Sequence, residues 1–178
     1  MILFVACTGV KDIQTVDEGE LITTVELLLT GASGDEQLFV WSDPELDGDP
    51  EVDPLVLGEG VYGIRVFFLN EAEDPAEDIT VEVADESDEH QVFYTGAEAL
   101  LDYVYEDEDD NGDPVGLLGT LTTLGPGEGA LTVTLRHLPP QNDQVVKGPG
   151  LAEVVAESGF AAIGGDTDAS VTFPVTVE

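Results

Sequence analysis

Basic residues are almost absent from this chain. Its 178 residues include four lysines and arginines against 39 aspartates and glutamates, which gives a net charge of −35. A surface with this charge repels phosphate groups, so the composition argues against nucleic acid and anionic lipid headgroups as partners. Such a surface also repels itself unless divalent cations bind it or salt screens it, since the Debye length falls to about 3 Å at 1 M. Two explanations of this composition stay open. The protein comes from a salt-adapted (halophilic) organism, or it is an acidic secreted protein of a mesophilic organism.

Cysteine occurs once, at Cys7, so an internal disulfide is excluded. Cys7 ends the apolar run "MILFVAC", which is too short to span a membrane as a helix. The run resembles the end of a bacterial lipoprotein signal, in which a small residue, here Ala6, precedes the cysteine that takes the lipid; the usual basic start is missing. We expect residues 1–19 to be a signal remnant and tether, with Cys7 lipidated and membrane contact only through that anchor. The alternative is a buried N-terminal strand with a free thiol.

The motifs of common enzymes are also missing. The sequence contains no nucleophile elbow, no phosphate-binding loop, no CxxC pair and no HExxH motif. Carboxylate pairs occur along the whole chain, so no single pair indicates glycosidase chemistry. We therefore expect no catalytic residues and no enzymatic activity, and a hydrolase ranks third among the functions considered.

What the sequence does have is strand-like alternation of apolar and polar residues. Hydrophobic residues make up 42% of the chain and acidic residues lie between the apolar runs, which indicates a folded core with an acidic surface. Turn sequences such as "GASGD" and "GPGEG" separate the runs. The expected strands cover residues 20–31, 36–41, 61–70, 79–83, 91–94, 100–105, 115–124, 130–138 and 169–177.

Eight or nine short strands with regular turns predict an all-β fold. We expect an antiparallel two-sheet sandwich, immunoglobulin-like in the broad sense, formed by a single domain of residues 20–178. Residues 150–159 are the one expected helix. Pro174 cannot donate to a strand ladder, so the last strand is predicted to lie at a sheet edge. The inward faces should carry residues 131, 133 and 135 of one strand and 171, 173 and 175 of the other.

Two acidic loops resemble calcium loops. Each has oxygen ligands at alternate positions and then a glycine, which lets a tight turn surround a hard cation. The ligand positions are Asp43, Glu45 and Asp47 in "DPELDG", and Asp107, Asp109 and Asn111 in "DEDDNG". Neither loop has the closing glutamate of an EF-hand, because its twelfth position is Pro54 or Leu118. Ca²⁺ sites and solvated acidic turns therefore both stay open.

The two histidines stand at strand ends. His90 follows four carboxylates in "DESDEH" and shares a strand face with Val92 and Tyr94, whereas His137 ends the strand whose inward face carries Leu135. Imidazoles at strand ends on inward faces are suited to converge on a metal or haem iron, and the nearby carboxylates are suited to orient a ring or to supply a hard ligand. The sequence thus predicts a shared transition-metal or haem site. The alternative is two hydrogen-bonded histidines at the edge of the core.

Four segments carry a resemblance to a known group. They are "ADESDEHQVFY", "YEDEDDNGDPVGL", "LTVTLRH" and "GGDTDASVTFPVTV". Over about residues 20–178 the chain resembles small acidic outer-membrane lipoproteins of Bacteroidota. The resemblance implies a lipid-anchored, extracytoplasmic location at the outer membrane or cell surface, and a TonB-dependent receptor as partner. The stretch 139–165 departs from the group because it is longer and more apolar.

These observations lead to one functional expectation and one alternative. We expect a surface lipoprotein that captures a metal ion or metal complex for a TonB-dependent outer-membrane receptor. The alternative is a structural surface protein, an adhesin or fibre subunit, whose acidic loops are made rigid by calcium. The two differ in whether His90 and His137 approach each other, because only the capture function requires it.

Overall fold

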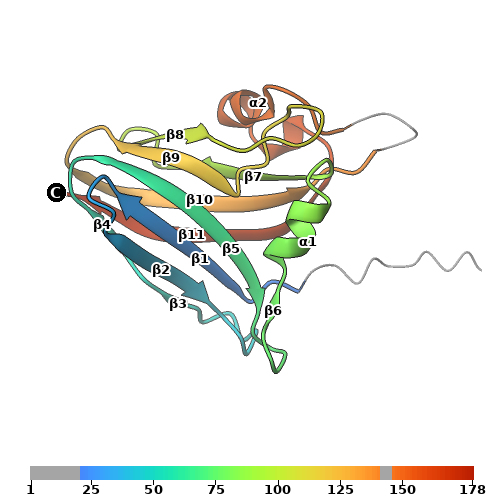
Figure 1. The fold of residues 1–178 in the computed structure, drawn as a ribbon, viewed down its shortest axis with the longest axis horizontal. Coiled ribbons are helices and arrows are strands. Elements are labelled where there is room, and N and C mark those ends of the chain that lie inside the picture. The colour runs from blue at the N-terminus through green and yellow to red at the C-terminus, as the bar shows by residue number, and fades with distance from the viewer. Residues whose placement is uncertain (1–20, 141–145) are drawn as a thin grey trace, which may run out of the picture.

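The computed structural model describes residues 21–140 and 146–178, and these form two packed β-sheets (Figure 1). The strands of the first sheet are β1 (Thr24–Gly31), β2 (Glu36–Ser42), β3 (Glu51–Val52), β5 (Val61–Asn70), β6 (Glu77–Asp78), β8 (Leu101–Tyr105) and β9 (Leu118–Thr123). Those of the second are β4 (Leu55–Leu57), β7 (His90–Thr95), β10 (Gly127–His137) and β11 (Asp166–Val177). Cys7 and the expected tether of residues 1–19 lie outside the described residues.

The predicted mostly-β, two-sheet fold is confirmed, with two differences in its details. The first sheet runs β3-β2-β1-β5-β9-β8 with β6 beside β5, and the second runs β4-β11-β10-β7. All strand pairs are antiparallel except β4 with β11, so the expectation of a purely antiparallel sandwich is wrong at that edge. The described residues also contain 11 strands rather than eight or nine. The additional strands β3, β4 and β6 have two or three residues each, too few to show an alternation.

Alternate residues of the long strands fill the space between the sheets. Leu135 and Phe173 are fully buried there, in the same core cluster as Leu27 and Phe68 of the first sheet. This pattern confirms the predicted inward faces, because period-two alternation places residues 131, 133 and 135 on one side of β10. The buried members of the two strands are Leu131, Val133, Leu135, Val171, Phe173, Val175 and Val177.

A smaller apolar cluster covers the outer face of the second sheet. Phe93 points away from the main core and packs with Leu138 beneath Val155 of helix α2 (Leu151–Ser158), a helix that the sequence predicted. The 3-10 turn η1 (Phe160–Ala162) follows, and the Phe160 ring meets the Phe93 ring edge-on with 5.4 Å between centroids. The described part of the unusual stretch 139–165 therefore serves as a lid on β7 and β10 (Figure 1).

Two local predictions are wrong. Residues 79–83 were expected as a strand, but helix α1 (Thr80–Asp85) lies there. Ile79 and Val83 are both buried, and their spacing of four places them on one helical face, which five residues cannot distinguish from alternation. Pro174 was expected on an edge strand, yet β11 lies between β4 and β10. The proline is accommodated because β4 pairs only with the stretch from Val175 to Val177.

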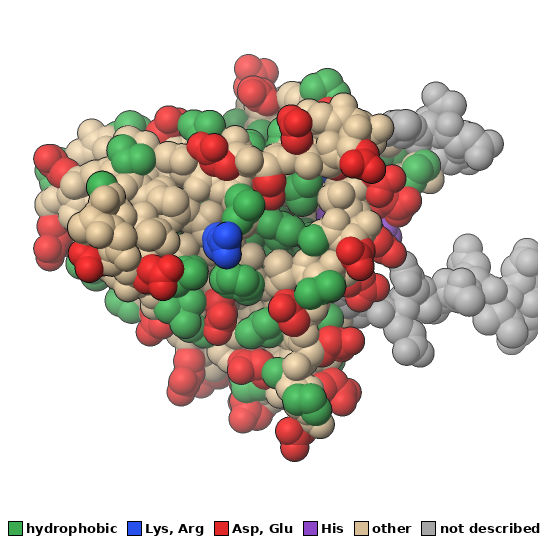
Figure 2. All heavy atoms as spheres, viewed as in Figure 1, with side chains coloured by type: hydrophobic (Ala, Val, Ile, Leu, Met, Phe, Trp, Pro, Cys, Tyr) green, Lys and Arg blue, Asp and Glu red, His purple; other side chains and the backbone are tan. Residues whose placement is uncertain are grey.

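The surface is acidic on the face shown in Figure 2, where carboxylates surround small apolar areas and basic side chains are almost absent. Arg136 and Lys147 are both buried, so among the described basic residues Arg65 is the exposed one. No described helix has the length and hydropathy needed to cross a membrane.

Candidate metal centre

His90 and His137 are direct cross-strand partners. His90 begins β7, His137 ends β10, and the antiparallel register pairs the two residues. Their imidazole rings stack with 4.7 Å between centroids and 10° between planes. The two histidines, which are the only ones in the chain, therefore meet at one end of the second sheet, as their strand positions predicted. Figure 2 shows histidine at the edge of the molecule next to acidic side chains.

The loop that follows α1 brings carboxylates to this pair. The backbone carbonyl of Glu86 accepts a hydrogen bond from His90 Nδ1 at 3.1 Å. Glu89 places Oε2 3.3 Å from His137 Nε2. The amide of Leu138 donates to the Glu89 carbonyl at 2.5 Å, which ties the loop to the end of β10. Within the described residues, one ligand atom each of Glu86, His90 and His137 lies within 4.8 Å of the others.

Asp168 reaches the pair through an irregularity in β11. Its neighbours Thr167 and Ala169 pair with successive residues of β10, so Asp168 is left without a cross-strand partner. A bulge of this kind changes the direction in which a side chain points. The Asp168 Oδ2 atom lies 4.0 Å from His90 Nε2. Sequence reasoning missed this residue because the bulge leaves no mark in the alternation of β11.

The electrostatics of the site are set by burial. His90 is 1% exposed, and burial lowers the pKa of its imidazole, while the hydrogen bond to the Glu86 carbonyl acts in the opposite direction. Burial raises the pKa of the Asp168 carboxyl, although His90, His137 and Arg136 oppose the shift. Asp168 Oδ2 is buried and has no hydrogen-bond partner among the described residues. Buried polar atoms in native proteins nearly always have such a partner, so this oxygen requires an explanation.

The group is chemically suited to a divalent transition metal. Zinc–nitrogen bonds are about 2.0–2.1 Å long, so two ligand atoms of one ion lie at most about 4.2 Å apart. The ligand atoms lie within 4.8 Å of one another, close to that limit. Because the two rings are stacked and nitrogen lone pairs lie in the ring plane, at least one imidazole must rotate for both to point at a shared ion. If His90 donates from Nδ1 to the Glu86 carbonyl, its Nε2 carries the lone pair that a metal needs. A backbone carbonyl commonly fixes a ligating histidine in this way.

A haem iron fits the geometry less well than a bare ion. The His90 ring is buried and one of its faces is covered by His137. An axial ligand must present a nitrogen to a wide porphyrin plane, which a buried, stacked ring does not do. The haem alternative stays a prediction of the sequence.

The first acidic loop is closed by its own backbone. Asp43 accepts hydrogen bonds from the amides of Asp47 at 3.1 Å and Gly48 at 3.0 Å. Asp47 in turn accepts from the amide of Asp49 at 2.9 Å. Gly48 has a φ of 81°, the left-handed conformation for which the sequence supplies glycine. The carboxylates at positions 43 and 47 thus hold the turn, and Glu45 is exposed beside them.

The second acidic loop already contains a cation from the chain itself. Asp109 accepts hydrogen bonds from the amides of Asn111 and Asp113, and from Lys147 Nζ at 2.8 Å. Asp107 accepts from the amides of residues 116 and 118. Within residues 21–140 and 146–178, the group of three acidic, histidine or cysteine ligands that could hold a metal is the one at His90, and it includes neither loop. Ca²⁺ binding by the loops stays a prediction.

No protein-family model, curated protein or solved structure matches this chain. The interpretation of the site therefore depends on its geometry and on the chemistry of its residues.

Proposed function

We propose that this protein captures a divalent transition-metal ion, with His90, His137 and Glu86 as ligands and Asp168 as an additional carboxylate beside them. One observation carries the proposal: two cross-strand imidazoles and a carboxylate place ligand atoms within 4.8 Å of one another. Imidazole nitrogens with one or two carboxylates suit zinc and its neighbours better than they suit calcium or magnesium.

The surroundings of the group support capture from solution. A net charge of −35 raises the local concentration of cations at the surface. The side chains of His137 and Glu89 are 24% and 34% exposed, so an ion can enter from their side while His90 lies behind them. The unpartnered Asp168 oxygen supports the same function, because a bound cation would compensate its burial.

The wider proposal concerns location and partner. We place the protein at the outer membrane or cell surface, anchored by a lipid on Cys7, with a TonB-dependent receptor that receives the captured ion. The support for this part is the resemblance to Bacteroidota lipoproteins and the lipoprotein-like start of the sequence. The finer fold assignment, an immunoglobulin-like sandwich in the broad sense, belongs to the same proposal. If the anchor is present, Cys7→Ser in the native gene context moves the protein from membranes to soluble fractions, and unchanged fractionation overturns it.

Calorimetric titration with Zn²⁺ after purification without chelator tests the metal site. The wild type should bind one ion, while His90→Ala and His137→Ala should each abolish binding and retain the circular dichroism of a β protein. Glu86→Gln should weaken binding, whereas its matched control Glu51→Gln, which removes the same charge from β3 at the edge of the first sheet, should leave binding unchanged. Retention of binding by both histidine variants would refute the proposal and leave the histidines as hydrogen-bonded residues at the edge of the core.

A further inference from the structure

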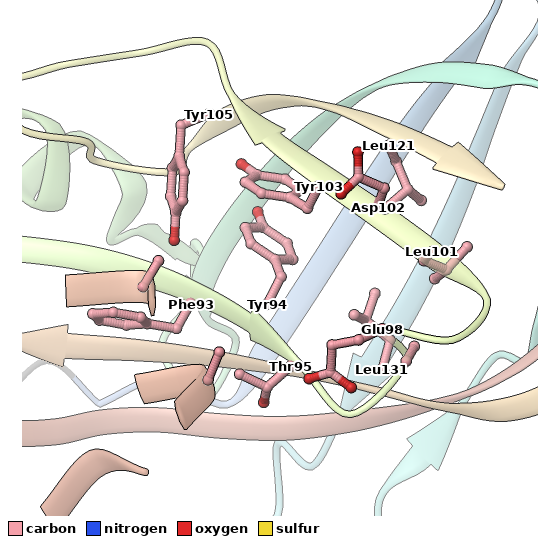
Figure 3. A pocket seen from close by; sticks show the side chains of 13 residues that line it. Phe93, Tyr94, Thr95, Glu98, Leu101, Asp102, Tyr103, Tyr105, Leu121 and Leu131 are labelled. Carbon is pink, nitrogen blue, oxygen red and sulfur yellow. The ribbon is translucent and has the colours of Figure 1, made fainter. Parts of the chain in front are cut away.

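A cavity of about 200 Å³ lies where β7 and β8 approach each other beneath α2 (Figure 3). Its lining comes from both sheets, with Leu121 and Leu131 buried on one side and Ala152 and Ala156 of α2 on another. Tyr94 belongs to this lining and stands four residues along β7 from the candidate metal site. At about 3.3 Å per residue, that spacing separates the two sites by about 13 Å. The cavity is therefore distinct from the metal site.

Three of the four tyrosines of the chain meet in this cavity. Tyr94 stacks on Tyr103 with 3.9 Å between ring centroids, and Tyr105 meets Tyr103 edge-on at 4.9 Å. The sequence leaves room for the cluster at Gly119, where a Cβ atom would collide with the Tyr103 ring. Figure 3 shows these side chains projecting toward one another from β7 and β8. The cavity thus has a fixed aromatic wall.

The tyrosine hydroxyls are already used by the backbone. Tyr94 donates to the Gly116 carbonyl at 2.9 Å, Tyr105 donates to the Val92 carbonyl at 2.8 Å, and Tyr103 donates to the carbonyl of residue 118 at 3.3 Å. Burial raises the pKa of all three phenols, that of Tyr105 to about 12. The rings are therefore neutral near pH 7, and their hydroxyl protons are committed to the protein.

Two carboxylates, Glu98 and Asp102, also line the cavity, and Asp102 lies beside Tyr103 on β8 (Figure 3). Glu98 and Asp102 are both exposed, and Glu98 uses one oxygen, Oε1, to accept a hydrogen bond from the amide of Gly96 at 2.8 Å. None of the lining residues is basic. The cavity thus offers aromatic surface and negative charge, while the tyrosine hydroxyl donors that line it are already bonded to backbone carbonyls. An anion would be repelled, and a ligand that brings its own positive charge would be attracted.

From this geometry we infer that the cavity binds a small organic cation, an ammonium compound of about the size of choline. Aromatic rings attract such cations through their electron-rich faces. The faces that Tyr94 and Tyr103 turn to each other are closed by their stacking, so the cation would contact the outer surface of the cluster, and the two carboxylates would supply the opposite charge. The volume sets the size, because about 30 Å³ per water molecule allows about seven waters, which is less than the space that a drug-sized ligand needs. The inference goes beyond the proposed function and does not depend on a metal at His90.

The test compares choline with its uncharged isostere 3,3-dimethylbutan-1-ol, using tyrosine fluorescence and ligand-observed NMR on the metal-free protein. Binding is measured in about 0.15 M NaCl, where a Debye length of about 8 Å screens the distant surface charges but not direct contacts with Glu98 and Asp102. Choline should bind at least about tenfold more tightly than the isostere. Equal affinity would show a merely apolar cavity and overturn the inference, as would the absence of choline binding.

Substitutions locate the binding. Glu98→Gln with Asp102→Asn should weaken choline binding at least about tenfold. Each of the two single variants should weaken it in part, whereas the control Glu51→Gln, which removes one charge from β3 at the edge of the first sheet, should leave it unchanged. Tyr103→Leu should abolish choline binding because it removes the aromatic ring. Tyr103→Phe retains the ring and should preserve choline binding. The phenylalanine variant therefore still tests the inference if the leucine variant folds poorly. Equal weakening in the Glu51→Gln control, or full binding in the double acid variant, would refute this site. The choline titration is repeated with His90→Ala. Choline binding should be unchanged in this variant, because the cavity does not depend on the metal site.

Discussion

Two pairs of ionisable groups, one fully buried and one partly exposed, contrast within the described part of the molecule. Lys147 and Asp109 form an ion pair at 2.8 Å, and each side chain is 1% exposed. His90 and Asp168 lie 4.0 Å apart, with side chains 2% and 16% exposed. Lys147 also donates to the Ser87 carbonyl at 2.5 Å, and Asp109 accepts from two backbone amides as well. The Asp168 Oδ2 atom, by contrast, has no hydrogen-bond partner among the described residues.

The two carboxylates differ in their partners: Asp109 has enough of them to compensate its burial, and Asp168 does not. Burial by itself raises the pKa of Asp109, but the hydrogen bonds from Lys147 and the backbone lower it below its usual value. At Asp168 burial prevails and the pKa is raised. A buried carboxylate oxygen without sufficient partners costs free energy, and a cation bound beside Asp168 would offset that cost. We therefore interpret Lys147–Asp109 as part of the structure, and the histidine group as part of the function.

The largest effect is expected from breaking the complete pair. Lys147→Met leaves the Asp109 carboxylate buried without its cation, so the free energy of unfolding should fall by about 3–5 kcal/mol. Urea denaturation of wild type and variant at the same ionic strength measures the change. The double variant Lys147→Met/Asp109→Leu is the control, because it removes both charges and should recover much of the loss. A loss below about 1 kcal/mol in the single variant would place the pair with ordinary surface ion pairs.

Zinc binding at the histidine group should stabilise the folded protein, by an amount that depends on the free zinc concentration. At a free concentration 100 times the Kd, a ligand that binds only the folded protein adds about 2.7 kcal/mol. The melting temperature of the wild type should rise accordingly in differential scanning calorimetry, and that of His90→Ala should not. A rise of the same size in His90→Ala would mean that zinc binds elsewhere on the acidic surface.

Acid should weaken zinc binding through His90. A proton competes with a metal for the imidazole, and burial lowers the His90 pKa below its ordinary value of about 6.5. Because this pKa is lowered, the unfolded state binds more protons as the pH falls below about 6.5, and His90 also destabilises the metal-free fold over that range. Zinc titrations from neutral to acidic pH should show binding that persists at 6.5 and decreases below it. Binding that is independent of pH would exclude imidazole ligands.

Removing the negative charge at Asp168 should have a small effect on the metal-free protein. Asp168→Asn keeps the shape of the side chain and removes a charge whose burial is poorly compensated, so the free energy of unfolding should change by less than about 1 kcal/mol or increase. Zinc affinity should nevertheless fall. Destabilisation as large as that of Lys147→Met would show that Asp168 is as well satisfied as Asp109, and the contrast between the two pairs would disappear.

Calcium should have the smallest effect. Asp43, Asp107 and Asp109 already accept hydrogen bonds from the chain, so at matched ionic strength calcium should raise the melting temperature less than zinc does. Scanning calorimetry in sodium and calcium solutions of equal ionic strength tests this expectation. A larger rise with calcium than with zinc would favour the alternative function, a structural protein with calcium-stiffened loops.

Much of the sheet and half of the candidate site could be predicted from the sequence, because both depend on alternation. The strand over residues 61–70 is found with those bounds, and the inward faces of β10 and β7 indicated where His137 and His90 would point. The register that makes the two histidines direct partners depends on how the two strands pair across the 47 positions that separate His90 from His137. No local pattern encodes that pairing.

The rest of the site depends on features that the alternation of apolar and polar residues does not reveal. Asp168 enters through a bulge, and bulges interrupt the alternation on which strand prediction relies. Lys147, 38 residues away in the sequence, donates its ammonium group to Asp109. The loop pattern alone predicted a bound calcium ion at this loop, whereas the chain supplies a lysine cation there. The same limit explains helix α1, whose five-residue apolar pattern fits either period.

X-ray absorption spectroscopy of the zinc-loaded protein tests the central claim most directly, because it reports which atoms surround the ion. The account predicts two imidazole nitrogens at about 2.0–2.1 Å together with carboxylate oxygens, and loss of the imidazole scattering in His90→Ala/His137→Ala. A spectrum with oxygen ligands alone, unchanged in that double variant, would contradict it and assign the bound zinc to the acidic surface.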